Sequence, residues 1–185
     1  MESLVYTTSK SDEDLLGILE LQRKNHSTNL TSEEISTQGF LTAIHSLENL
    51  RNLHAIQPHI ICKHKRKVIA YQLAMTENSK NEIPVLVPMF EVFNSILLRG
   101  KPISGYTYIV VGQVCVDKNY RGQGILDRCY TEYKYHLKDK YDFAITEISG
   151  RNLRSINAHK RIGFSEIFKY TSSIREEWSV VIWEW

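Results

Sequence analysis

The fold is decided by the stretch VCVDKNYRGQGIL, residues 114–126. It begins as an apolar, β-branched run, passes through RGQG, and continues directly into residues 126–138, whose sequence is typical of a helix. This order predicts a strand, a glycine-bearing turn and a helix. A helix N-terminus exposes unpaired N–H groups at the positive end of its dipole, and glycines let a ligand come close to them. The stretch therefore predicts an anion site suited to phosphate or pyrophosphate, the alternative being a turn that binds nothing.

The spacing of the glycines identifies the kind of loop. It is neither the Gly-x-Gly-x-x-Gly of dinucleotide-binding folds nor the Gly-Lys-Ser/Thr of nucleoside-triphosphate loops. Residues 121–125, RGQGI, instead resemble the acyl-CoA pyrophosphate loop of the GNAT superfamily, the acetyl-CoA-dependent N-acetyltransferases. That loop usually reads Arg/Gln-x-x-Gly-x-Gly/Ala, and Leu126 departs from it at the last position. The Leu126 side chain could crowd the pyrophosphate or point into the core between helix and sheet.

A second stretch, NLRSINAHKRIGF at residues 152–164, resembles the downstream GNAT segment. Asn152, a small residue three positions on, and Gly163-Phe164 match the family at the same spacing, and the strand-like run 141–149 lies between the two motifs. The resemblance implies an α/β (α+β) fold with a mixed, mostly antiparallel central sheet flanked by helices. It also implies that the fourth and fifth strands splay apart.

The same resemblance implies how the cofactor is bound. The fourth strand would be residues 106–116, with a bulge at Gly112, and the pantetheine arm of acetyl-CoA would pair with its free backbone groups at Val114 and Val116. The cofactor-binding residues implied are Val114, Cys115, Val116, Arg121, Gly122, Gln123, Gly124, Ile125, Leu126 and Asn152. Asn152 would bond the pantetheine or, alternatively, cap the helix that follows it.

The bulk composition is that of an ordinary globular protein. The chain has 185 residues, 42% of them hydrophobic and 24% charged, which suits a single domain over residues 1–185. A net charge of +2, from 23 basic and 21 acidic residues, gives no electrostatic case for a nucleic-acid or membrane partner. The 3 widely spaced cysteines favour neither a disulfide framework nor a metal site. Without an apolar leader or span, we expect a cytoplasmic protein.

Apolar periodicity gives the remaining elements. Strands are expected at residues 4–8, 58–62, 68–75, 141–149, 166–172 and 178–185. Helices are expected from Ser11, from a capping box at residues 31–34 continuing at helical spacing through Phe40 to Leu50, over residues 126–140, and over 152–161. We expect His26, His45 and His54 to be ordinary polar positions of the first two helical segments.

Residues 84–98, PVLVPMFEVFNSILL, are the most individual part of the chain. They predict a short helical insertion where this fold can have a short turn. The segment either contributes to acceptor selectivity or only fills the core.

Acetyl transfer to an amine needs a polarised thioester carbonyl, a neutral amine and a stabilised thiolate. His159 matches the position of a GNAT Tyr that protonates the thiolate, and an imidazole with an unperturbed pKa of about 6.5 could do the same. The alternative is a helix His that faces solvent. Glu147 could be the base, directly or through water, but strand alternation alone does not fix its face. A water or main-chain relay is the open alternative.

The sequence thus predicts an N-acetyltransferase. It would transfer an acetyl group from acetyl-CoA to a primary amine of a small molecule or protein, by direct attack in a ternary complex and without a metal. The alternative is a non-catalytic acyl-CoA-binding regulatory module, and a third interpretation is a structural α/β protein with chance motifs. Oligomeric state, including a homodimer, stays open.

Overall fold

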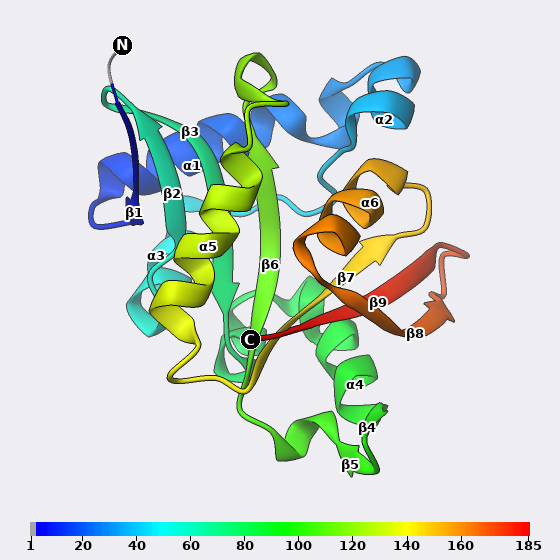
Figure 1. Ribbon diagram of the computed structural model, residues 1–185. Helices are drawn as coiled ribbons and strands as arrows, with labels where there is room; N and C mark the ends of the chain where they lie inside the picture. Colours follow the sequence, from blue (N-terminus) through cyan, green and yellow to red (C-terminus); the bar gives the residue numbers. More distant parts are fainter. Residues whose placement is uncertain (1–2) are drawn as a thin grey trace.

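The computed structural model describes residues 3–185 and contains one seven-stranded sheet in the order β1-β2-β3-β6-β7-β9-β8 (Figure 1). Every neighbouring pair in this sheet is antiparallel except β6 and β7, which run parallel. Its strands are β1 (Leu4–Thr8), β2 (Ile60–His64), β3 (Lys67–Met75), β6 (Tyr108–Val116), β7 (Phe143–Ser149), β8 (Ser165–Thr171) and β9 (Glu177–Glu184). The expectation of a mixed, mostly antiparallel sheet is confirmed.

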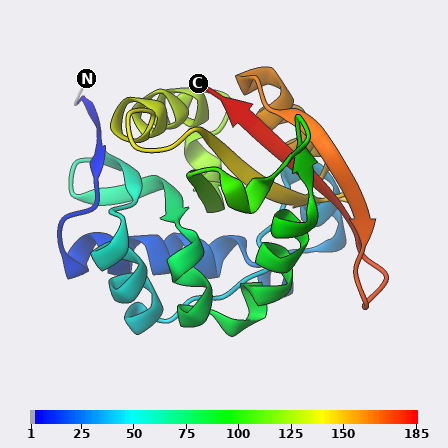
Figure 2. The same ribbon diagram turned by 90° about the horizontal axis from the view of Figure 1, so that it is seen from below.

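Two helical layers cover the sheet. Figures 1 and 2 show α1 (Asp12–Asn25), α3 (Leu47–Ile56) and α4 (Val87–Ser95) on one face, and α5 (Ile125–Leu137) with α6 (Leu153–Ile162) on the other. Each face has its own core: Ile18, Leu50 and Phe93 are fully buried on the first, and Tyr130 and Tyr133 on the second. Each such side chain contributes on the order of 1.5–3 kcal/mol by leaving water.

The parallel pair β6–β7 is short. Pairing joins Tyr108 to Phe143 and ends at Val110 with Ile145, after which β7 continues beside β9 alone. The bulge expected at Gly112 is present as a register shift in the β3–β6 ladder. A Cβ at Gly112 would lie 2.0 Å from the sulfur of Met75, so a larger residue here would require the Met75 side chain to move. The fourth and fifth strands of the main sheet therefore splay apart.

The expected helix from residue 31 through Leu50 is wrong. A capping box at Thr31 does open α2 (Ser32–Gln38), but Gly39 ends that helix with a φ of 73°. Leu41 then pairs with the end of α1, because its N–H donates to the Asn25 carbonyl at 3.0 Å. A second capping box at Ser46 starts α3. The apolar residues at helical spacing therefore belong to the extended segment after α2 and to the start of α3, and none of them lies in α2.

The segment of residues 84–98 contains the helix α4. Phe90 and Phe93 on this helix are buried in the first core, and a small two-stranded sheet follows, made of β4 (Leu97–Leu98) and β5 (Lys101–Pro102). At least part of the segment thus fills the core. Within residues 3–185, no helix has the length and apolarity needed to cross a membrane.

Candidate active site

A cleft of about 1170 Å³ opens where β6 and β7 separate. Its floor is formed by the diverging strand ends, residues 111–116 and 146–149. One wall consists of the N-terminal end of α5 and of one side of α6. The other is formed by residues 38–44 at the end of α2 and beyond it, by the start of α4, and by residues of β8, β9 and the turn between them. The cleft therefore joins the two faces of the sheet.

The glycine loop lies at the α5 side of this cleft. Gly122 and Gly124 have φ angles of 76° and 73°, in the left-handed region that glycine adopts without strain. No side chain caps α5, whereas Ser11 caps α1 and Asn152 caps α6. The first-turn N–H groups of α5 are therefore free to bind an anion. A Cβ at either glycine would meet no protein atom within 4 Å, so both positions face open space.

Arg121 is braced beside this loop. Its Nε donates to the Val116 carbonyl at 3.0 Å, and its Nη2 donates to Oδ1 of Asn25 at 2.6 Å. No carboxylate within residues 3–185 lies within ion-pair distance of the guanidinium. Burial lowers the pKa of this guanidinium below its usual value. Arg121 thus places a half-buried positive charge beside the loop, with Asp117 and Glu34 close enough to act on it electrostatically.

The other loop residues are placed in different ways. Leu126 lines the cleft but packs against the second core, in line with the inward-pointing alternative. The Gln123 amide is exposed and donates to the Asn119 carbonyl at 3.3 Å. Cys115 is buried in the first core, and burial raises the pKa of its thiol to about 12. The thiol is therefore inert at neutral pH, and only the backbone of Cys115 is suited to binding.

Asn152 serves its own helix. Its Oδ1 accepts from the Ser155 N–H at 3.2 Å, which is the cap of α6, and its Nδ2 donates to the Phe40 carbonyl at 3.2 Å. The capping alternative is therefore present in the structure, and the side chain also ties residues 38–44 to α6. Its bond to pantetheine stays a prediction.

His159 is buried, with 2% of its surface exposed, and both ring nitrogens have protein partners. Nδ1 lies 2.8 Å from the Ser155 carbonyl, which can only accept, so Nδ1 carries the proton. Nε2 therefore accepts from the Tyr130 hydroxyl at 2.6 Å. Burial lowers the pKa of His159 to about 4, which keeps the ring neutral at pH 7. This geometry does not favour direct proton donation by His159, although the ring lines the cleft.

Glu147 lies on the face of the sheet that α1, α3 and α4 cover, opposite the face that holds His159. It lies on the same face of β7 as Phe143 and Ile145, which both belong to the first core, so the alternation along the strand settles the face that the sequence left open. Its Oε2 accepts from the Tyr170 hydroxyl at 2.6 Å, and the residue lines the cleft. Burial raises the pKa of the Glu147 carboxyl to about 7. A carboxyl with this pKa can accept and release a proton near neutral pH.

A buried polar network on the same face was not identified from the sequence. Oε1 of Gln113 accepts from the Gln22 amide at 2.7 Å and from the Tyr71 hydroxyl at 2.5 Å, and its Nε2 donates to the Ala43 carbonyl at 2.9 Å. His45, expected to be an ordinary polar position, joins this network through Gln22 and is buried. The network fixes the wall at residues 38–44 to β6. Its members are too far apart in the chain for a sequence motif to reveal them.

Ser155 is another residue of the cleft that was not identified from the sequence as part of the site. It lines the cleft, and its Oγ lies 3.3 Å from Nδ1 of His159. The signal was available, because Ser155 occupies the slot for a small residue and adds a hydroxyl there.

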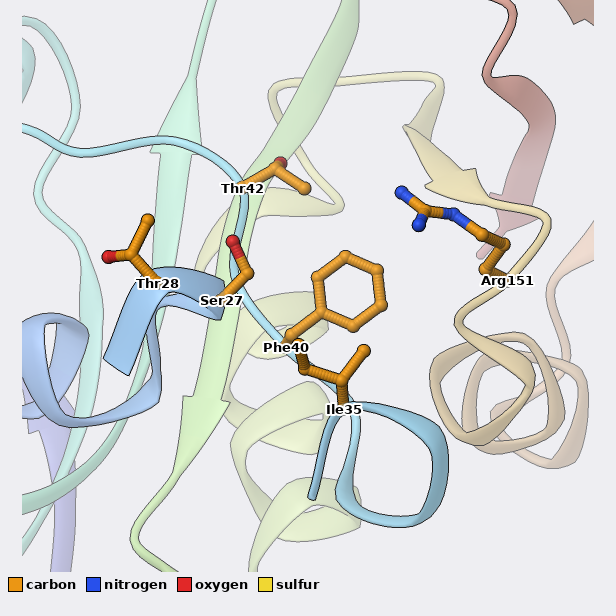
Figure 3. Close-up of a pocket in the computed structure, with 6 residues that line it drawn as sticks. All are labelled: Ser27, Thr28, Ile35, Phe40, Thr42 and Arg151. Carbon is orange, nitrogen blue, oxygen red and sulfur yellow. The ribbon is translucent and has the colours of Figure 1, made fainter. Parts of the chain in front are cut away.

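A shallower pocket of about 420 Å³ lies beside the cleft. Figure 3 shows the Phe40 ring between Ser27 and Arg151, with Ile35 below it. The Arg151 guanidinium lies 5.8 Å from the Phe40 ring centroid and pairs with Glu176 at 2.8 Å. Because Phe40 lines both hollows, the segment of residues 38–44 forms the partition between them.

No protein-family model matches the sequence, and no curated protein matches it by sequence. Solved structures do match the fold. A protein from Desulfovibrio desulfuricans assigned to the GNAT family has a TM-score of 0.65 at 10% identity, covering 98% of this chain and 99% of that one. Arabidopsis thaliana NAA60 in complex with acetyl-CoA has a TM-score of 0.61 at 11% identity, covering 99% and 100%. A chain of the NatC complex bound to Gag peptide and CoA has a TM-score of 0.66 at 15% identity, covering 100% and 99%.

These structures match the present chain over nearly its whole length and theirs. The chain therefore has the fold of the GNAT N-acetyltransferases.

Proposed function

We propose that this protein is an N-acetyltransferase that moves an acetyl group from acetyl-CoA to a primary amine by direct attack in a ternary complex. The observation that carries the proposal is the position of Glu147. Its carboxyl, with a pKa near 7, lies in the same cleft as the uncapped N-terminus of α5 but on the other face of the sheet. A base and an anion site joined through a gap in the sheet suit a two-substrate transfer.

Acetyl-CoA fits the residues on the α5 side. The pyrophosphate would accept from the free N–H groups after Gly124, where open space allows close approach, beside the unpaired charge of Arg121. The pantetheine arm would lie in the gap and pair with backbone groups at Val114 and Val116, because no strand within residues 3–185 pairs with that edge of β6. The thioester would then reach the floor of the cleft.

The transfer itself needs no covalent enzyme intermediate. The amine nitrogen forms a bond to the thioester carbon while Glu147 accepts the amine proton. The carbon–sulfur bond then breaks, and its electron pair goes to sulfur. Solvent protonates the CoA thiolate, and Glu147 returns its proton to solvent. Holding both substrates in line supplies much of the rate.

Binding and turnover can be tested separately. At a concentration of 100 times its Kd, acetyl-CoA is expected to stabilise the protein by about 2.7 kcal/mol, seen as a thermal shift of several degrees. A screen of amines for thiol release from acetyl-CoA, with mass analysis of the product, tests turnover. A thermal shift without turnover on any amine would instead support the regulatory acyl-CoA-binding module. No shift at millimolar acetyl-CoA would contradict both.

The Ser155 hydroxyl would stabilise the departing sulfur, and His159 would orient that hydroxyl. The Tyr130 hydroxyl donates to the imidazole, whose Nδ1–H points to the carbonyl and hydroxyl oxygens of Ser155. The Ser155 hydroxyl hydrogen is then free to donate into the cleft. Hydrogen bonds whose donors all point in one direction strengthen one another, so this series of hydrogen bonds is suited to stabilising a developing thiolate. His159 would thus be a neutral positioning residue rather than the proton source.

Ser155→Ala is expected to lower kcat by about tenfold to a hundredfold, because one hydrogen bond to the transition state is lost. The KM for acetyl-CoA should change little, and Ser155→Thr should restore much of the rate. The α6 cap should survive in both variants, since Asn152 accepts from the Ser155 backbone and not from its hydroxyl. Parental kcat in Ser155→Ala, measured where chemistry limits the rate, would rule this hydroxyl out.

A further inference from the structure

The acceptor side of the cleft carries almost no charge. Among the described residues that line the cleft on this side, Glu147 is the one Asp, Glu, Lys or Arg side chain. The remaining charged side chains that line the cleft belong to the glycine loop, α5 and α6. These elements form the opposite wall, where the cofactor is proposed to bind. The acceptor wall is instead uncharged, with large apolar and aromatic side chains at Leu86, Met89, Tyr170 and Trp178 beside small hydroxyl side chains such as Thr42 and Ser172.

A cation of the neighbouring pocket, Arg151, is already paired with a carboxylate. Arg151 follows β7 and pairs with Glu176, whose Oε1 also accepts from the Arg151 Nε at 3.1 Å. This bidentate pair leaves no free guanidinium for a carboxylate on the acceptor. An acceptor with several positive charges would likewise find a single carboxyl, that of Glu147, which its own reaction uses.

The mouth of the acceptor side is flanked by exposed apolar side chains. Ile44 is 67% exposed in the segment after α2, and Ile174 is 82% exposed in the turn between β8 and β9. Both line the cleft, so an apolar group that enters beside the amine would cover them. Such burial favours binding by about 25 cal/mol for each Å² removed from water.

We infer that the acceptor is a primary amine carried on an uncharged, apolar group. The inference rests on the proposed function and names the substrate class for that site. Two sources supply this chemistry: a small aryl- or alkylamine, and the α-amine of a peptide whose first side chains are apolar. A polyamine or an amine with a free carboxylate does not match the charges of the cleft.

The test is a thiol-release assay on matched amines. Phenethylamine, and a peptide amide with Leu in its first two positions, are compared with spermidine and glutamate. We expect kcat/KM for one of the two apolar acceptors to exceed that for either charged acceptor by about tenfold or more, which corresponds to about 1.4 kcal/mol. The ratio of kcat/KM for phenethylamine to kcat/KM for the peptide amide shows which of these two kinds of amine the site prefers. Preference for spermidine or glutamate overturns the inference and leaves acetyl transfer standing, whereas no turnover with any amine counts against the proposed function itself.

Introducing a negative charge at the mouth sharpens the test. Ile44→Asp and Ile174→Asp are expected to lower kcat/KM for the apolar acceptor by about fivefold or more and to raise it for spermidine. Leu97→Asp is the matched control, because Leu97 is 66% exposed on β4 and does not line the cleft. All three positions are exposed, so the folded state should tolerate the change. If all three variants changed kcat/KM equally, or if Ile44→Asp and Ile174→Asp left it unchanged, the acceptor would not enter past Ile44 and Ile174.

Discussion

Replacing Glu147 with Gln is expected to lower kcat by about a hundredfold to ten-thousandfold, the range typical of a lost proton-transfer group. The amide has the same shape and can still accept from Tyr170, but it cannot take the proton of the attacking amine. Initial rates at saturating acetyl-CoA measure the effect. Glu91→Gln is the control, because Glu91 is exposed on α4 and does not line the cleft. Near-parental turnover in Glu147→Gln, with chemistry rate-limiting, would mean that water deprotonates the amine.

The same substitution should change the pH dependence of the reaction. In the parent protein, kcat/KM should rise as Glu147 loses its proton, with an acidic limb near the pKa of about 7. Glu147→Gln should lose this limb, because an amide does not exchange a proton near neutral pH. A limb that persists unchanged in the variant would assign it to another group, such as the amine.

Stability provides a reading that does not depend on activity. Burial raises the pKa of Glu147 from the ordinary 4.5 to about 7, so between these values the folded state binds a proton that the unfolded state releases. The contribution of this group to stability is therefore present at low pH and is lost as the pH rises through 7. Glu147→Gln should melt at the parental temperature near pH 4 and above it at pH 8. This result would also show that the variant is folded.

Gly124→Val should weaken acetyl-CoA binding by about tenfold or more, equivalent to about 1.4 kcal/mol. Its added side chain would occupy the open space where the pyrophosphate meets the α5 N–H groups. The left-handed φ of 73° adds a backbone cost of roughly 1–2 kcal/mol, which a control must separate from the loss of binding. Isothermal calorimetry with CoA measures the Kd directly.

Gly100→Val is that control. Gly100 has a φ of 79° and, like Gly124, open space around its missing Cβ, but it lies in the turn between β4 and β5 and does not line the cleft. Both variants should lose stability to a similar extent, and only Gly124→Val should lose affinity for CoA. Equal affinities in the two variants would mean that the glycine loop does not hold the pyrophosphate.

The parts of the fold that were predictable from the sequence are those set by neighbours in the chain. The strand, glycine turn and helix around residues 114–126 follow from local composition, and the bulge at Gly112 follows from a glycine inside an apolar strand. The continuous helix from residue 31 through Leu50 was wrong because Gly39 and the cap at Ser46 outweigh apolar spacing. Gly39 and Ser46 are local signals for the end and the start of a helix, and they predict the helix boundaries here better than the spacing of apolar residues does.

The chemistry of the site depended on contacts between distant residues. The motif located His159 correctly on its helix, but its burial results from packing against Tyr130, which lies 29 positions earlier in the chain. The face of Glu147 required the register of β7, and its raised pKa required a desolvated cleft that no single stretch encodes. The sequence could therefore name candidate residues, whereas their burial and their hydrogen-bond partners follow from the three-dimensional arrangement.

The early end of the β6–β7 ladder has a consequence for solubility. Unpaired main-chain groups at the rim of a sheet are templates on which other chains add as strands and aggregate. Here the groups suited to an extended ligand lie in the middle of the sheet, with strands on both sides and helices above and below (Figures 1 and 2). Main-chain groups placed there are less open to strand addition than those at the rim of a sheet.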